Sequence, residues 1–257
     1  MSLINKQLII KKWEPYDVVD FGLSVKWLKY NLAGDKLTDN ESDYGYYYQW
    51  GDTIGYPDAA KHNFRYLTTP YIKNPVEPTF TKYVAEPLFG DVDNKDVLDP
   101  EDDAVTTLLG SEYRMPTKDE YIELCKHCSG VTELKSSDYD NILIDNNKDS
   151  ILKNGVYWIN SNSVIDGVKY INSGTLFVGQ DITKRIFFPA AGYCYDSKVA
   201  NKCSFGRYLT KSLNINCSCY VYRLSFGSKN IFGKLTLDYN SRDSRYYGCS
   251  IRGIKIS

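Results

Sequence analysis

Seven cysteines are the residues of this 257-residue chain with the most reactive chemistry. Cys125 and Cys128 form a C-x-x-C pair, and Cys217 and Cys219 form a C-x-C pair. A structural zinc site takes four ligands at suitable spacing, and one C-x-x-C with a distant C-x-C is a weak match. We therefore interpret these cysteines as reduced thiols that act mainly as small hydrophobic residues.

Histidine-based chemistry is not expected, because the chain has only two histidines, His62 and His127. The sequence also contains no Gly-rich phosphate loop and no G-x-S-x-G nucleophile elbow. We therefore predict that the protein is not an enzyme, that it has no catalytic residues, and that it needs no cofactor or metal ion.

An acidic run between Asp91 and Asp103 weakly matches a calcium-binding loop. The stretch Asp91-Val-Asp-Asn-Lys-Asp96 lacks the glycine and the glutamate that such loops require, and Lys95 stands where an oxygen ligand belongs. Helix initiation explains the later acids, with Asp99 as the N-cap and Pro100 as the first helical residue. We therefore predict no metal site here.

Amide, guanidinium and tyrosine side chains gather in the loops of the C-terminal region. Amide and guanidinium groups can bind sugar hydroxyls, and tyrosine rings present an apolar face beside a polar hydroxyl. The alternative interpretation is that they are ordinary solvated loop residues. The candidate ligand-binding residues are Asn214, Asn216, Asn230, Asn240, Arg242, Arg245, Tyr246 and Tyr247.

Hydrophobic periodicity predicts the elements that must position these side chains. Thr117-Lys-Asp-Glu120 is a capping box that begins a helix ending at Gly130, and an earlier helix is expected from Pro100 to Gly110. Two helices and many strands predict an α+β domain. Strands are expected at 19–27, where alternate residues are apolar, and at 156–159, 168–171, 185–192, 220–226, 235–239 and 248–256.

Two segments do not follow this regular pattern. Residues 1–17 are predicted to be a docking arm, whose apolar side chains would attach the protein to a partner; an edge strand of the same domain is the alternative. Residues 53–98 have five prolines and little periodicity, which predicts a long surface excursion from the domain at 18–257. The candidate docking residues are Leu8, Ile9, Ile10 and Trp13.

The composition excludes several classes of protein. Hydrophobic residues make up 42% and charged residues 25%, which is typical of a soluble globular protein, and no apolar run is long enough to cross a membrane. The N-terminus has no signal-peptide core, so we expect a protein made in the cytoplasm and released, if at all, by lysis. Residues 184–257 carry 13 Lys and Arg against three Asp, but a net charge of -1 argues against a nucleic-acid partner.

Several segments occur in the order found in one known family. Together they resemble the Fibrobacter-type major paralogous (FISUMP-like) domain, which is common in gut Bacteroidetes and their phages, over about residues 18–256. The segments are Val19-Asp-Phe-Gly-Leu-Ser-Val-Lys-Trp27, Asp43-Tyr-Gly-Tyr-Tyr-Tyr-Gln-Trp-Gly-Asp52, Pro100-Glu-Asp-Asp-Ala104, Tyr113-Arg-Met-Pro-Thr-Lys-Asp-Glu120, Phe188-Pro-Ala-Ala-Gly-Tyr193, Tyr208-Leu-Thr-Lys-Ser212 and Gly248-Cys-Ser-Ile-Arg252.

The resemblance implies a C-type-lectin-like domain, with two short helices and an irregular, mostly antiparallel sheet. In such folds the chain ends pair, and the C-terminal half presents a ligand-binding surface. Family members usually carry a signal sequence, and this chain departs from that pattern. We therefore expect a virion protein of a bacteriophage: a head fibre, a capsid decoration or a tail-associated adhesin.

The expected partners are other virion proteins and a host-surface glycan, with no nucleic acid and no membrane. A homotrimer is expected only by analogy with virion fibres. One alternative is a bacterial cell-surface binding module of the same fold. Another is a cysteine-dependent oxidase related to sulfatase-modifying enzymes, which would use Cys217 and Cys219, although their spacing does not match the expected pattern.

Overall fold

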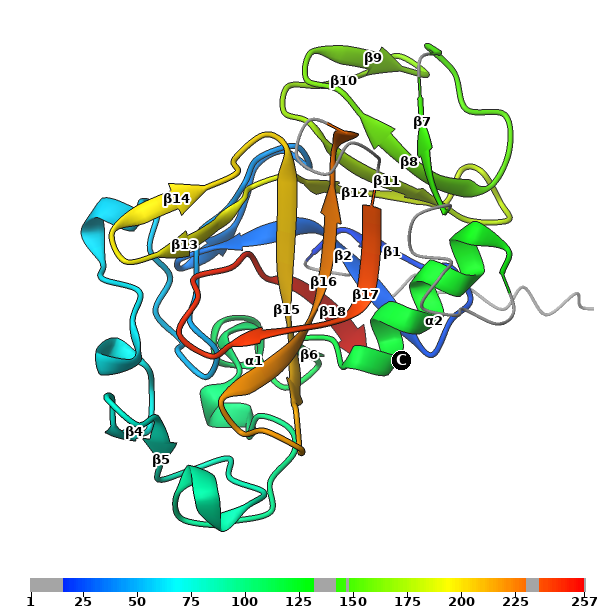
Figure 1. Ribbon diagram of the computed structural model, residues 1–257. Coiled ribbons are helices and arrows are strands. Elements are labelled where there is room, and N and C mark those ends of the chain that lie inside the picture. Colours follow the sequence, from blue (N-terminus) through cyan, green and yellow to red (C-terminus); the bar gives the residue numbers. More distant parts are fainter. Residues whose placement is uncertain (1–15, 132–141, 147, 230–235, 257) are drawn as a thin grey trace, which may run out of the picture.

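The computed structural model describes residues 16–131, 142–146, 148–229 and 236–256. The predicted docking residues Leu8, Ile9, Ile10 and Trp13, and the candidate Asn230, lie outside the described residues. Within these ranges the fold is α+β, as predicted, with two α-helices, α1 (Ala104–Leu109) and α2 (Lys118–Ser129), among many strands (Figure 1). None of the described helices is long and apolar enough to span a membrane.

One sheet brings the two ends of the described chain together. Its order is β1 (Val18–Val19), β2 (Val25–Ala33), β18 (Arg252–Ile256) and β6 (Tyr113–Arg114), and β3 (Lys36–Leu37) also pairs with β2. The last strand is therefore hydrogen-bonded between an early strand and a middle one, in antiparallel register with both.

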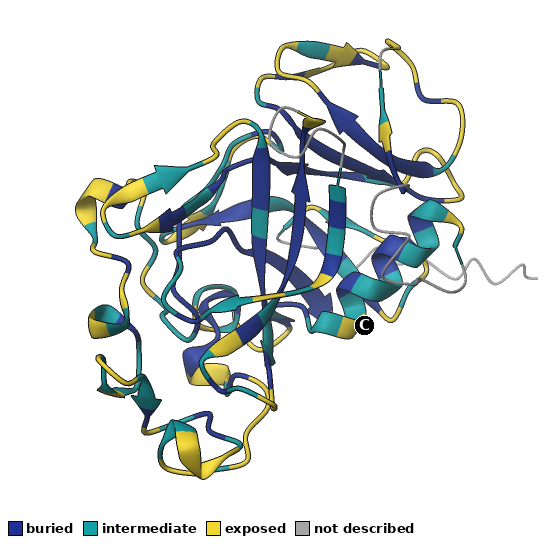
Figure 2. Ribbon diagram, viewed as in Figure 1, coloured by how far each residue is buried: buried dark blue, intermediate teal, exposed yellow. Residues whose placement is uncertain are grey.

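Two further sheets pack against the buried face of helix α2 and form a hydrophobic core cluster with it. The first has the order β12 (Arg185–Pro189), β11 (Gly174–Val178), β8 (Gly155–Ile159) and β7 (Leu143–Asp145). The second is an antiparallel meander in the order β15, β16, β17. Both sheets send apolar side chains onto α2, and Figure 2 shows their central strands as buried. The strands of the meander are β15 (Phe205–Leu213), β16 (Tyr220–Gly227) and β17 (Thr236–Ser244).

Three hairpins and four short 3-10 turns complete the described part of the chain. The hairpins are β4 (Ile72–Asn74) with β5 (Thr79–Phe80), β9 (Ser163–Ile165) with β10 (Val168–Tyr170), and β13 (Tyr193–Tyr195) with β14 (Lys198–Ala200). The 3-10 turns are η1 (Ala59–Lys61), η2 (Tyr66–Thr68), η3 (Pro87–Phe89) and η4 (Pro100–Asp102).

The second predicted helix is confirmed, and the first begins later than predicted. In α2 the Thr117 side chain accepts from the Glu120 amide while Glu120 accepts from the Thr117 amide, and Gly130 ends the helix in the left-handed region at φ 74°. Ahead of it, Pro100–Asp102 form only a 3-10 turn. Asp103, not Asp99, caps α1, because its carboxylate accepts from the first free amides of that helix.

The prediction of a single strand over 19–27 is wrong. Residues 20–24 form a turn between β1 and β2, so that Val19 pairs with Trp27 in an antiparallel register. Gly22 adopts φ 74°, and the Asp20 side chain accepts from its amide at 2.9 Å. An alternation of apolar residues cannot distinguish one strand from a tight reversal with both arms buried. The strand predicted at 248–256 is also shorter, because only Arg252–Ile256 belong to it.

Residues 53–98 form a largely irregular segment at the lower left of Figure 1. Its aromatic residues Phe64, Phe80 and Tyr83 are fully buried. Asp102, the last residue of η4, binds side chains within this segment: it accepts from the hydroxyls of Tyr71 and Tyr83 and lies 2.6 Å from the Lys82 ammonium. The excursion is therefore anchored at both its aromatic and its charged side chains.

Candidate functional site

The structure disperses the candidate ligand-binding residues and buries two of them. Asn214 and Arg245 have no exposed surface, so the expectation that they present polar groups to a ligand is wrong. The Asn214 side chain instead accepts from the Asn216 amide at 3.0 Å and holds the β15–β16 turn. Asn216, Asn240 and Arg242 are exposed.

Arg245 has a structural role, because its buried guanidinium contacts several separate segments of the chain. Its guanidinium lies 4.0 Å from the ring centroid of Phe80 and 4.8 Å from that of Trp50. It donates to the carbonyl oxygens of Lys82, Tyr83 and Ser218 at 3.3 to 3.4 Å, and burial lowers its pKa. These contacts join the excursion to the meander, and this is the reason that the arginine is buried.

Five tyrosine rings form a continuous row at the surface. The ring centroids of Tyr66 and Tyr246 are 4.7 Å apart, and those of Tyr246 and Tyr247 are 4.4 Å apart. The row continues from Tyr247 to Tyr193 at 5.4 Å and from Tyr193 to Tyr195 at 6.0 Å. Tyr195 is exposed and the other four rings are half-buried. We call these five residues the tyrosine row.

Backbone pairing brings these rings together from three distant segments. The amides of Cys194 and Gly248 each donate to the other residue's carbonyl, at 2.7 and 2.9 Å, so β13 runs beside the segment after β17 at the left of Figure 1. Side chains alternate along an extended strand, so Tyr193 and Tyr195 share one face while Cys194 is buried on the other. The Gln49 side chain donates to the Tyr246 carbonyl at 3.0 Å and fixes that residue.

An ion network lies beneath the row on the meander. The Arg207 guanidinium stacks 3.4 Å from the ring centroid of Tyr193 and contacts the Asp243 carboxylate. Arg223 Nε lies 3.0 Å from the same carboxylate. Burial raises the pKa of Asp243, and the two guanidinium groups oppose that rise by favouring its charged form. The network holds the central rings of the row in fixed positions.

The tyrosine row offers neutral phenol groups together with the faces of its rings. Burial raises the pKa of Tyr66 to about 12 and raises that of Tyr193 and Tyr247, so the phenols stay neutral near pH 7. Neutral phenol hydroxyls donate and accept hydrogen bonds, and the rings offer apolar faces. This combination suits a ligand that has hydroxyl groups and flat apolar faces.

Only two of the eight predicted residues, Tyr246 and Tyr247, belong to the row. Arg242 lies opposite Tyr222 in the β16–β17 pair, and its neighbour Asp243 points to the other face of the strand, so Arg242 faces away from the row. Sequence analysis missed Tyr66, Tyr193, Tyr195 and Arg207. Only the alternation in Tyr193-Cys-Tyr195 carried a signal, because nothing in the sequence links residue 66 to residue 246.

Burial raises the pKa of three of the four cysteines in the two predicted pairs. Cys125 and Cys128 are buried in the core against the two sheets, and burial raises the pKa of both thiols. Cys219 is half-buried; burial, with Cys217 beside it, raises its pKa to about 11. A thiol that stays protonated is a poor nucleophile and a poor metal ligand at neutral pH.

The acidic residues around Asp99 form ion pairs with the ammonium group of Lys82. Carboxylate oxygens of Asp99, Glu101 and Asp102 lie within 4.8 Å of one another, but the Lys82 ammonium is 2.8, 3.5 and 2.6 Å from them. In the weak calcium-loop match, Asp93 accepts from the amides of Tyr83, Val84 and Lys95. These carboxylates are committed to internal contacts.

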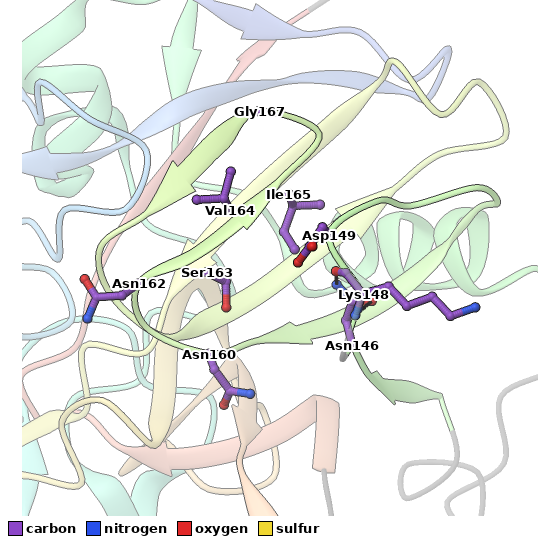
Figure 3. Close-up of a pocket in the computed structure, with 9 residues that line it drawn as sticks. All are labelled: Asn146, Lys148, Asp149, Asn160, Asn162, Ser163, Val164, Ile165 and Gly167. Carbon is purple, nitrogen blue, oxygen red and sulfur yellow. Dashed lines mark hydrogen bonds between the residues drawn. The ribbon is translucent and has the colours of Figure 1, made fainter.

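A second polar surface lies between the β9–β10 hairpin and the segment after β7 (Figure 3). It is an open depression of about 580 Å³ that includes Asn146, Lys148, Asn160 and Asn162. Figure 3 shows Lys148 and Asn162 pointing in opposite directions, and Asn160 accepts from the Trp158 indole at 3.1 Å. Its polar groups therefore do not converge on one ligand position, in contrast to the tyrosine row.

No protein-family model, curated protein or solved structure matches the chain. The tyrosine row and the ion network of Arg207, Arg223 and Asp243 are therefore the features of the molecule that bear on function.

Proposed function

We propose that this protein binds carbohydrate through the tyrosine row. The observation that carries the proposal is the convergence of five partly exposed rings from three chain segments that are far apart in sequence. Aromatic rings lose little conformational entropy on binding and combine an apolar face with a polar end, which suits the alternating faces and hydroxyls of sugars. Rings needed only for packing would be expected to be buried, as Tyr208 and Tyr121 are.

The fold we propose for this binding protein is C-type-lectin-like. Two features support that proposal: the last strand, β18, pairs with the early strand β2, and the row lies mainly on the C-terminal half of the chain. Both agree with what the sequence resemblance implies.

The setting that we propose is the surface of a bacteriophage virion, where the protein would be a head fibre, a capsid decoration or a tail-associated adhesin. The sequence resemblance to a domain common in gut Bacteroidetes and their phages supports this setting. Mass spectrometry of purified particles should find the protein as a stoichiometric component. Its absence from particles, with presence on bacterial cell surfaces, would instead favour the cell-surface binding module.

Removing single rings should weaken sugar binding without unfolding the protein. A glycan array identifies a bound sugar, and calorimetry then compares the full-length protein with Tyr195→Ala and Tyr246→Ala. We expect each substitution to weaken binding by about two- to tenfold, since one aromatic contact contributes about 0.5–1.5 kcal/mol.

Tyr30→Ala is the matched control, because Tyr30 is also half-buried but lies on β2 and hydrogen-bonds Asp17. Its affinity should equal that of the unsubstituted protein. An array without any bound glycan, or unchanged affinity in both row variants, would refute carbohydrate binding at the row.

A further inference from the structure

The ion network beneath the tyrosine row carries an excess of positive charge. Two guanidinium groups, those of Arg207 and Arg223, share the single carboxylate of Asp243. Within the described residues, Arg207 Nε and Arg223 Nη1 are buried without a hydrogen-bond partner. Asp238 adds a weaker electrostatic attraction to Arg223 but forms no ion pair with it. Positive charge therefore remains in excess in the two ion pairs, and charge held in a low-dielectric region projects an electrostatic potential over the adjacent surface.

A second positive charge stands at the exposed end of the row. Lys198 pairs with Tyr195 in the β13–β14 hairpin, so the two side chains are neighbours on one face. Lys198 is exposed, and in the described part of the chain no carboxylate lies within ion-pairing distance of it. Asp196, which follows Tyr195 in the sequence, is paired with Arg65 at 2.5 Å.

Cations therefore outnumber carboxylates on and under the row. The cations are Arg65, Lys198, Arg207 and Arg223, and the carboxylates are Asp196, Asp243 and Asp238. A neutral sugar would gain nothing from this excess, whereas a sugar carboxylate would gain a charge-assisted contact with the Lys198 ammonium and attraction toward Arg207.

We propose that the tyrosine row selects acidic oligosaccharides, those that contain a uronic or sialic acid, over neutral ones. The sugar ring stacks on the exposed ring of Tyr195, and its carboxylate pairs with Lys198 in the field of the Arg207–Arg223 pair. This inference rests on the proposed function and names its ligand class.

A glycan array tests the inference with the full-length protein when each acidic oligosaccharide is printed beside its carboxyl-reduced, neutral form. Calorimetry with the best acidic probe and its reduced form then measures both affinities. We expect the acidic form to bind at least about tenfold more tightly at low salt, in line with a charge-assisted contact. The preference should shrink as the ionic strength rises above about 0.1 M.

Lys198→Gln should weaken binding of the acidic probe about three- to fivefold, as expected for one exposed ion pair, and leave the neutral form unchanged. Lys169→Gln is the matched control: Lys169 is an equally exposed lysine on the separate β9–β10 hairpin, and its removal should change neither affinity.

The outcomes separate the two proposals. If the neutral forms bind as tightly as the acidic ones, or if Lys198→Gln binds like the unsubstituted protein, acid selectivity is wrong while carbohydrate binding stands. If no glycan of either kind binds, the proposed function fails and the inference fails with it.

Discussion

Two arginines show how the surroundings of a single residue decide its role. Arg245 and Arg207 both stack on aromatic rings. Arg245 is fully buried and donates hydrogen bonds to backbone carbonyls. Arg207 is half-buried beneath the tyrosine row and binds a carboxylate. Their sequence neighbourhoods do not reveal this difference, because the walls around Arg245 come from residues far away in the chain, such as Trp50 and Phe80. The prediction for Arg245 failed for this reason.

The Cys217–Cys219 pair provides a test at the residue scale of the prediction that the protein is not a thiol enzyme. With a pKa of about 11, Cys219 should react slowly with iodoacetamide near pH 8, and its rate should rise about tenfold per pH unit up to about pH 10. Peptide mass spectrometry after timed labelling measures the rate at each cysteine.

Cys203 is the internal control because its side chain is exposed, and it should be labelled first. Rapid labelling of Cys219 near neutral pH, or tight copper binding that protects both Cys217 and Cys219, would contradict the assignment and favour the oxidase hypothesis.

At the scale of elements, local signals were reliable where local contacts decide the structure. The capping box of α2 forms as predicted, and Gly130 ends the helix. The start of α1 was predicted at the wrong aspartate because Asp103 has a second, non-local function: its carboxylate also accepts from the Met115 amide at 2.9 Å. The contact with the Met115 amide therefore decides which of several aspartates, each suitable as a local cap, begins the helix.

The contact between the excursion and η4 should be sensitive to acid. Burial by itself raises the pKa of Asp102, but hydrogen bonds from Lys82, Tyr71 and Tyr83 outweigh it and hold the pKa below its usual value. A carboxyl group with a lowered folded-state pKa stabilises the fold above its unfolded pKa of about 3.9, and this stabilisation is lost as the pH falls through the folded value.

Urea unfolding of the unsubstituted protein and of Asp102→Asn measures this contribution. The substitution should lower the free energy of unfolding by about 1–3 kcal/mol near pH 7, and the difference should shrink below about pH 4. Asp39→Asn is the control, since Asp39 forms only an exposed ion pair with Lys36. A constant difference between Asp102→Asn and the unsubstituted protein down to about pH 2 would show that the charge of Asp102 is not what anchors the excursion.

At the scale of the whole molecule, the class of the fold was predictable and the site was only partly so. Strand periodicity and helix caps sufficed for an α+β domain. Tyr246 and Tyr247 were identified from composition alone, because adjacent tyrosines in a polar loop favour recognition. Tyr66 and Tyr193 could not be assigned to the row from the sequence. Tyr193 reaches it through the pairing of β13 with the segment after β17, and Tyr66 reaches it through the folded excursion.

The closure of the chain also belongs to this scale. Arg252 on β18 donates to Asn31 Oδ1 at 2.9 Å and to the carbonyl of Phe187 at 2.7 Å, so the last strand joins the terminal sheet to the sheet around α2.

The central claim is that sugar binds on the tyrosine row, and aromatic NMR of protein labelled with ¹³C-tyrosine tests it most directly. Single Tyr→Phe substitutions assign the ring signals, and the oligosaccharide selected by the glycan array is then titrated in. We predict shifts confined to the rings of Tyr66, Tyr193, Tyr195, Tyr246 and Tyr247, with saturation at the calorimetric affinity, while the buried Tyr208 and the remote Tyr30 stay unchanged. Shifts centred on Tyr170, which pairs with Ser163 of the β9–β10 hairpin, or on Tyr157, which lines a separate pocket with Asn146 and Lys148, would contradict the claim. The absence of tyrosine shifts at saturating sugar would contradict it as well.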